Sequence, residues 1–123
     1  MERIRSKKKT EKLVKKYLKY WNNEYGDNEW RIDVYHIDEK EVNPKTGRVL
    51  AAGCNANWQY KEAVLNFNIN VLSKMEDWEV EETVLHELMH VFVNPMSRKP
   101  FSKKEDFVVT TLARLFMRTK YNG

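Results

Sequence analysis

Cysteine is nearly absent from this sequence, which has a single one, Cys54, among 123 residues. One cysteine cannot form an internal disulfide and cannot build a thiolate zinc site alone, a pattern that fits a reducing compartment. Any metal ion in this chain would therefore have to be held by histidine and carboxylate side chains. We expect Cys54 itself to be a small residue of the core.

Long apolar runs are also missing. No stretch approaches the roughly 18 residues that a membrane-spanning helix requires. Met1 is followed by a basic segment, ERIRSKKKTEK, with no apolar stretch behind it. These features predict a soluble, unsecreted protein of the cytoplasm that has no membrane partner.

The residues that are present suffice for one packed core. Hydrophobic residues make up 41% of the chain and aromatic residues 12%, which excludes a disordered polypeptide. Domains most often have roughly 100–150 residues. We therefore predict one domain that spans residues 1–123.

Positive charge is concentrated near the start of the chain. The net charge is only +4, but residues 3–19 are rich in Lys and Arg. A basic helix of this kind can contact nucleic acid or another anionic surface. A solvated helix face is the simpler interpretation, because no aromatic residues alternate with the first lysines. We favour the solvated face and keep weak nucleic-acid contact as an alternative.

Hydrophobic spacing predicts an α+β fold. Apolar residues recur at steps of three and four in residues 10–21, 73–93 and 101–118, which predicts three amphipathic helices. Residues 29–37, 51–60 and 62–71 alternate with a period of two, which predicts strands, the last two forming an antiparallel hairpin. In residues 62–71, Asn66, Asn68 and Asn70 should face outward. We expect a small, mostly antiparallel three-stranded sheet with one helix before it and two after it.

Local signals predict where the two later helices begin and end. Ser73 and Glu76 have the spacing of a capping box at the start of the second helix. That helix should stop at Asn94, because Pro95 disfavours helical geometry in the residue before it. Ser102 should cap the last helix.

The stretch TVLHELMHVFVNP contains the pattern H-E-x-x-H, formed by His86, Glu87 and His90. Positions four apart lie one helical turn above each other, so both histidines can bind one metal ion. The glutamate beside the first ligand can take a proton from a water on that ion, the arrangement of H-E-x-x-H metallopeptidases. A helix that merely buries these polar groups is less plausible, because burial without partners costs several kcal/mol. We predict a Zn²⁺ site.

The third protein ligand is expected on the last helix. The metzincin pattern is excluded, because Val93 and Met96 occupy the positions of its Gly and His. A carboxylate from a following helix is the usual alternative, and Glu105 and Asp106 are both available. Glu105 forms an S-x-x-E capping box with Ser102, whereas Asp106 should face the core side. We therefore prefer Asp106 and keep Glu105 as the substitute.

At this point the chain resembles a small zincin of the gluzincin type, the minigluzincins, through VLHELMHVF and EDFVVTTLARLF. Predicted phage-like peptidases and ImmA/IrrE-like peptidases are similar in layout. The resemblance implies a zinc peptidase, expected to be an endopeptidase, that acts on protein or peptide substrates bound as an added antiparallel strand. It also implies that a polar residue four positions after the ligand carboxylate supports the first histidine, and Thr110 has that spacing from Asp106.

Peptide hydrolysis also requires a group that stabilises the oxyanion. No motif identifies one, and the candidates are His36, Tyr60, Arg98 and Tyr121, each with a structural role as the simpler interpretation. Two rival functions remain open at this stage. One is a basic nucleic-acid-binding protein with a structural zinc site, and the other is a latent peptidase whose metal position is blocked by the first helix or by the KYNG tail.

Overall fold

The computed structural model describes residues 4–25, 30–37, 51–57, 59–93 and 103–122. Along these residues the elements are α1 (Lys7–Tyr25), β1 (Arg31–Ile37), β2 (Ala52–Asn57), β3 (Glu62–Asn68), α2 (Ile69–Leu72), α3 (Asp77–Val93) and α4 (Lys103–Asn122). The predicted α+β class is confirmed. Within the described residues, none of the helices combines the length and the apolar character needed to cross a bilayer.

The sheet has the strand order β1-β3-β2. β2 and β3 form the expected antiparallel hairpin, with Cys54 opposite Leu65. β1 pairs with β3 in parallel, with Val34 opposite Leu65. The sheet is therefore mixed, and the prediction of a mostly antiparallel sheet was wrong. The reason is that alternation fixes which side chains share a face, but it is the same in both pairing directions.

The segment between the sheet and α3 also differs from its prediction. β3 ends at Asn68 and is followed by the short helix α2, in which Asn70 is buried, as is Asn68 before it, rather than facing outward. Ser73 ends α2, and its hydroxyl donates a hydrogen bond to the Asn70 carbonyl at 2.8 Å. At the start of α3, the Glu76 N–H donates instead to Glu79 Oε1 at 3.1 Å. The predicted Ser73 capping box is wrong because Ser73 is used by the preceding helical turn.

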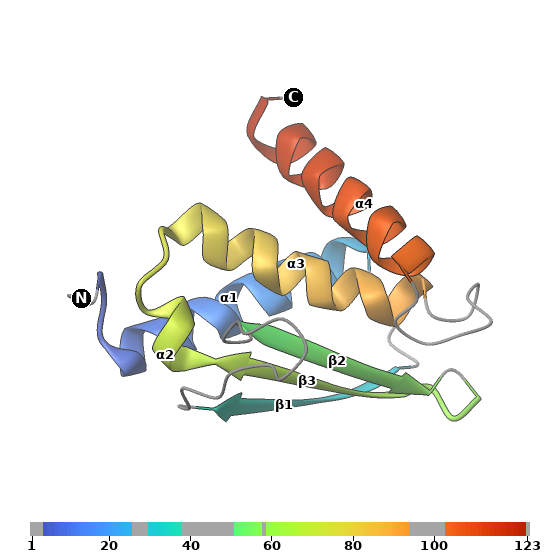
Figure 1. Ribbon diagram of the computed structural model, residues 1–123, viewed down its shortest axis with the longest axis horizontal. Coiled ribbons are helices and arrows are strands. Elements are labelled where there is room, and N and C mark those ends of the chain that lie inside the picture. Colours follow the sequence, from blue (N-terminus) through green and yellow to red (C-terminus); the bar gives the residue numbers. More distant parts are fainter. Residues whose placement is uncertain (1–3, 26–29, 38–50, 58, 94–102, 123) are drawn as a thin grey trace.

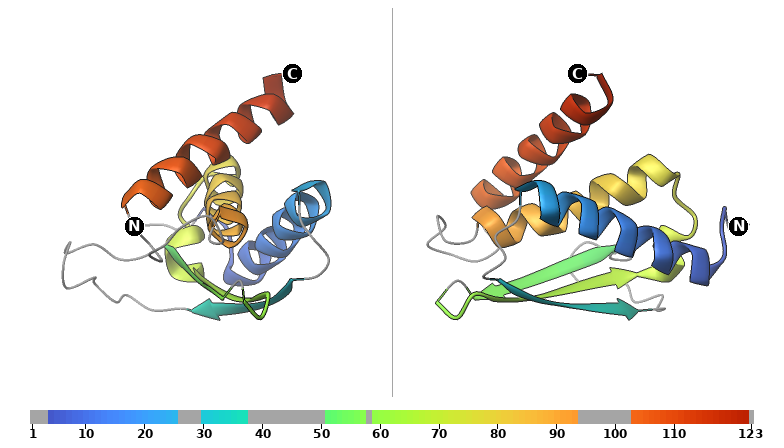
Figure 2. Two further views of the ribbon diagram at one scale, coloured as in Figure 1. Left: turned by 90° about the vertical axis from the view of Figure 1, so that its right-hand side faces the viewer. Right: turned by 180° about the vertical axis from the view of Figure 1, so that it is seen from behind.

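The helices form layers on one face of the sheet. Figure 1 and the two views of Figure 2 show α1 and α3 over this face and α4 crossing α3 on the side away from the sheet. The buried apolar core includes Val14, Tyr17, Trp21, Cys54, Leu65, Phe67, Val84, Leu88, Val91, Val109 and Ala113. α3 is thus covered by the sheet on one side and by α4 on the other. It ends at Val93, in line with the predicted stop before Pro95, while Ser102 lies outside the described residues.

Candidate metal centre

The H-E-x-x-H motif lies in the second half of α3, where the helix passes between β2 and α4. His90 and Glu87 are buried, with 6% and 8% of their surface exposed, and His86 is half-buried. The apolar positions around them, Leu85, Leu88 and Met89, are fully or almost fully buried. Packing therefore fixes this segment as a helix and holds both imidazoles on the side that faces α4.

Three potential ligand atoms form a small triangle between α3 and α4. The two Nε2 atoms of His86 and His90 are 3.2 Å apart. Asp106 Oδ1 lies 3.2 Å from His86 Nε2 and 3.5 Å from His90 Nε2. Donors around a tetrahedral zinc with bonds of about 2.0–2.1 Å are about 3.3 Å apart. The residues His86, His90 and Asp106 therefore form a possible metal-binding triad with suitable spacing.

Glu105 contacts the opposite nitrogen of His90. Its Oε2 lies 2.8 Å from His90 Nδ1, and the side chains are 1% and 7% exposed. Because a carboxylate accepts, His90 Nδ1–H donates, and this leaves the lone pair of Nε2 directed at the triad. We expected Asp106 to face the core, but its side chain is 62% exposed and Glu105 is the buried one. The two adjacent acidic residues thus contact different sides of one histidine.

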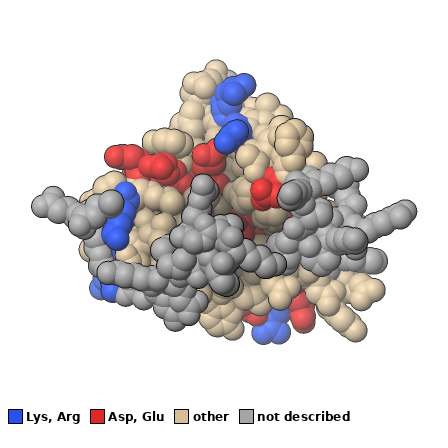
Figure 3. Space-filling view, viewed as in Figure 1, with Lys and Arg blue, Asp and Glu red and all other residues tan. Residues whose placement is uncertain are grey.

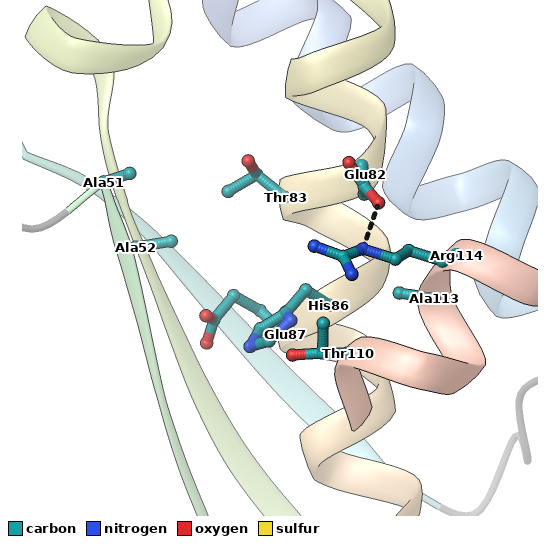
Figure 4. Close-up of a pocket in the computed structure, with 9 residues that line it drawn as sticks. All are labelled: Ala51, Ala52, Glu82, Thr83, His86, Glu87, Thr110, Ala113 and Arg114. Carbon is teal, nitrogen blue, oxygen red and sulfur yellow. Dashed lines mark ion pairs between the residues drawn. The ribbon is translucent and has the colours of Figure 1, made fainter. Parts of the chain in front are cut away.

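A pocket of about 310 Å³ opens beside the triad. Its lining comes from α3, α4 and the start of β2, and consists of Ala51, Ala52, Glu82, Thr83, His86, Glu87, Thr110, Ala113 and Arg114. In Figure 4, the Glu87 side chain projects from α3 toward β2. Neither α1 nor the described part of the last turn of α4 contributes a residue to this lining.

Burial changes the proton affinities of the groups in this pocket. It raises the pKa of Glu87 to about 7, with His90 opposing the rise and Asp106 adding to it. Burial also lowers the pKa of His86, an effect that His90 strengthens and Asp106 opposes. A lower pKa favours the neutral imidazole, which is the form that binds metal ions. Cys54 on β2 has its pKa raised to about 12 by burial and by the charges of Glu87 and Glu105, so it is a protonated core thiol.

Three of the four predicted oxyanion candidates lie in the described residues, and none of the three lines this pocket. His36 lies on β1, with Nδ1 3.6 Å from Glu11 Oε1. Tyr60 is 73% exposed in the turn between β2 and β3, and Tyr121 donates a hydrogen bond to Glu81 at the far end of α4. Arg98 lies outside the described residues. Thr110 lines the same pocket as His86.

Sequence reasoning missed Arg114, which lines the pocket from α4. Arg114 follows Thr110 by one turn and Asp106 by two, so helical spacing contained a signal for it. The role of Glu105 behind His90 was also missed. That role has no local signal, because it depends on the distance between two helices.

A second polar cluster joins α3 and α4 at the other end. Glu81, fully buried, accepts hydrogen bonds from Trp21 Nε1 at 2.8 Å, Lys120 Nζ at 2.6 Å and the hydroxyl of Tyr121. Lys120 Nζ also lies 3.9 Å from the centre of the Tyr20 ring, a cation–π contact. This cluster fastens the C-terminal end of α4 to α1 and α3.

Comparisons of the chain with models of protein families, with curated proteins and with solved structures find no match. The functional conclusion therefore depends on the geometry of the triad and its pocket.

Proposed function

We propose that this chain is a cytoplasmic zinc metallopeptidase of the gluzincin type that hydrolyses peptide bonds in proteins or peptides. The observation that carries this proposal is the triangle of His86 Nε2, His90 Nε2 and Asp106 Oδ1, with edges of 3.2, 3.2 and 3.5 Å. Three protein donors of this kind leave a coordination position for water, the pattern of catalytic rather than structural zinc.

His86, His90 and Asp106 would hold the zinc ion, which would supply Lewis-acid activation of a water molecule and of the peptide carbonyl. Glu87 takes a proton from the attacking water as the water oxygen bonds to the peptide carbon. The same carboxyl then gives this proton to the amine nitrogen as the C–N bond breaks.

Among the described residues, one edge of the sheet lies beside the pocket. β2 is an edge strand among the described strands, and Ala51 and Ala52 at its start line the pocket opposite α3. We propose that a peptide pairs with this edge as an added antiparallel strand, the mode of β-augmentation. The small alanine side chains leave room for the peptide to pass close to Glu87.

The central test replaces Glu87 by Gln, which keeps the shape and removes the base. We expect zinc content to stay near one equivalent and kcat/KM on a labelled unfolded protein such as casein to fall by about 10³-fold. Glu62→Gln, an exposed substitution at the start of β3, is the matched control and should change neither. Hydrolysis that survives Glu87→Gln would remove Glu87 as the base, and zinc-loaded protein that cleaves no peptide would contradict the peptidase.

A second candidate function is weak nucleic-acid contact through α1. Lys8, Lys12, Lys15 and Lys19 are exposed and follow one another by one turn along a single face of this helix. A stripe of this kind can neutralise successive phosphates. Binding to single- or double-stranded DNA that weakens steeply with salt, and less steeply after Lys12→Ala with Lys15→Ala, would support it. Binding without salt dependence would argue against phosphate contacts.

A further inference from the structure

Arg114 projects from α4 into the pocket, near His86. Figure 4 shows its guanidinium between Glu82 and His86, with the two terminal nitrogens on the side away from Glu82. Arg114 lies one turn beyond Thr110 on α4, and both residues line the pocket.

The hydrogen-bonding capacity of Arg114 is largely unused by the described residues. Its ion pair with Glu82 is long, 3.9 Å from Nε to Oε1, which exceeds a hydrogen bond. The Arg114 side chain is 71% exposed, whereas that of Glu82 is 31% exposed. Glu82 approaches only the Nε side, so the terminal pair of nitrogens remains directed at the pocket. A guanidinium presents such a pair as a fork that matches a carboxylate.

The pocket around the Arg114 guanidinium has room for a ligand, and few of its lining residues are charged. Ala51, Ala52, Thr83 and Ala113 are small, and the cavity measures about 310 Å³. Arg114 is the one basic residue among the described lining residues, which otherwise carry the acidic Glu82 and Glu87. Figure 3 shows acidic side chains around the central hollow of this face and basic side chains just above it. A divalent cation on the triad would offset these acidic groups, so a further carboxylate is not excluded by charge.

We propose that Arg114 binds a carboxylate of the peptide substrate next to the bond that is cleaved. This inference rests on the proposed peptidase function and adds the substrate class: peptides with an acidic side chain beside the scissile bond, or with a free C-terminal carboxylate at that position. Both sources present the same planar group to the Nη pair. Glu82 holds the guanidinium from the Nε side and is a positioning residue.

Binding can be measured separately from hydrolysis. The ¹⁵N-labelled full-length chain, loaded with zinc, is titrated with N-acetyl-glutamate amide, N-acetyl-alanine and N-acetyl-glutamine amide. These probes offer a side-chain carboxylate, a terminal carboxylate and neither. We expect a carboxylate probe, and not the glutamine probe, to shift the amide signals of Thr83, Ala113 and Arg114. Any direct coordination of zinc by a probe is common to all variants, so differences between variants report on Arg114.

Arg114→Ala should lower the affinity for the carboxylate probe that binds more tightly by about tenfold, the loss expected for a charge-assisted bidentate contact. The probe affinity of Arg114→Lys should lie between those of the unmodified chain and Arg114→Ala, because an ammonium keeps the positive charge but cannot form the bidentate contact. Arg118→Ala, an exposed arginine on α4 that does not line the pocket, is the matched control and should change nothing. Equal affinity of Arg114→Ala and the unmodified chain, or equal shifts with the glutamine probe, would overturn the proposal.

Cleavage products distinguish the two carboxylate sources. A synthetic peptide library is digested, and the new ends are identified by mass spectrometry. Enrichment of Asp or Glu beside internal cuts indicates a side-chain carboxylate, whereas release of C-terminal residues that is blocked by C-terminal amidation indicates a terminal one. Arg114→Glu should abolish either preference and favour Lys or Arg instead. A uniform loss of rate on all peptides would overturn carboxylate binding and assign Arg114 to the peptide carbonyl.

The two proposals fail in different ways. If the probes bind through Arg114 but no peptide is cleaved, the carboxylate site stands and the peptidase does not. If peptides are cleaved with no acidic preference and Arg114→Ala binds the probes unchanged, the peptidase stands and this inference does not.

Discussion

Two polar clusters join α3 to α4, one at each end of their contact. At one end, Glu81 is surrounded by Trp21, Lys120 and Tyr121. At the other end, His86 and His90 meet Glu105 and Asp106. Both clusters consist of polar side chains inside a helix pair that is otherwise held together by apolar residues such as Val84, Val109 and Ala113.

The difference lies in where the positive charge comes from. The Glu81 cluster contains its own cation, because Lys120 lies 2.6 Å from the carboxylate. The histidine cluster is built from imidazole nitrogens and carboxylate oxygens, which share the property of donating lone pairs. A buried carboxylate that accepts from three donors has its hydrogen-bonding capacity satisfied and needs no further ligand. Three convergent lone pairs, in contrast, are typical of a cation site. The same pair of helices, α3 and α4, thus carries the Glu81 cluster at one end and a candidate metal centre at the other.

Zinc should separate the two ends most strongly. At a free zinc concentration about 1,000-fold above Kd, binding to the native state adds about 4 kcal/mol, which corresponds to a rise in Tm of roughly 10 °C or more. His90→Ala should abolish both the rise and the bound equivalent, as measured by differential scanning calorimetry and elemental analysis. Lys120→Met should keep the zinc-dependent rise from a lower starting point. Metal that remains bound to His90→Ala would contradict the ligand assignment.

Lys120→Met tests how much the Glu81 cluster contributes to stability. The substitution leaves Glu81 buried, 0% exposed, without its cation, so we expect a loss of about 3 kcal/mol in the free energy of unfolding. Urea denaturation of the zinc-free protein measures it. The double variant Glu81→Gln with Lys120→Met removes both charges and should recover most of the loss. A single variant as stable as the unmodified chain would show that the pair adds nothing to stability.

Replacing the two adjacent acidic residues one at a time tests which of them is the metal ligand. Glu105→Gln should lower zinc affinity by about 10–100-fold and keep the stoichiometry, because Glu105 acts through His90. Asp106→Ala should lower affinity further, since it removes a ligand atom. Isothermal titration with zinc gives both values. The reverse order of the two affinities would exchange the roles of Glu105 and Asp106.

Alkaline pH should weaken the Glu81 cluster, and this is the smallest of the four effects. Burial alone would lower the pKa of Lys120, but its hydrogen bonds to Glu81 and Tyr121 outweigh burial and raise it. The stabilisation by Lys120 is therefore complete below the unfolded pKa of about 10.4 and is lost as pH rises through the higher folded value.

The pKa of Tyr121 is also raised, by burial and by its bond to Glu81. The unfolded phenol ionises first, so the folded state loses stability above about pH 10. We expect the free energy of unfolding of the zinc-free chain, measured in urea, to fall more steeply between pH 9 and 11 than that of Tyr121→Phe. The free energy of unfolding of His90→Ala should decline with pH as steeply as that of the unmodified chain. A shallower decline in His90→Ala would place the alkaline transition at the histidine cluster.

Local patterns in the sequence were sufficient for much of the candidate site. His86 and His90 lie four residues apart on one helix, and the 3.6-residue turn brings their rings together whatever else the chain does. The same spacing makes Glu87 the neighbour of the first histidine. The three long helices and the hairpin of β2 with β3 were predicted from periodicity for the same reason, because each is a local arrangement.

The tertiary structure decided which distant groups meet. The direction of β1, the burial of Glu105 in preference to Asp106, and the position of Arg114 on the pocket wall all depend on how elements far apart in the sequence pack together. Adjacent residues such as Glu105 and Asp106 point about 100° apart on a helix, so a modest change in the crossing of α3 and α4 decides which one meets which nitrogen of His90. The sequence by itself determined the placement of the two histidines and of Glu87 on one helix, and the packing of α4 against α3 determined how the candidate metal centre and its pocket are completed.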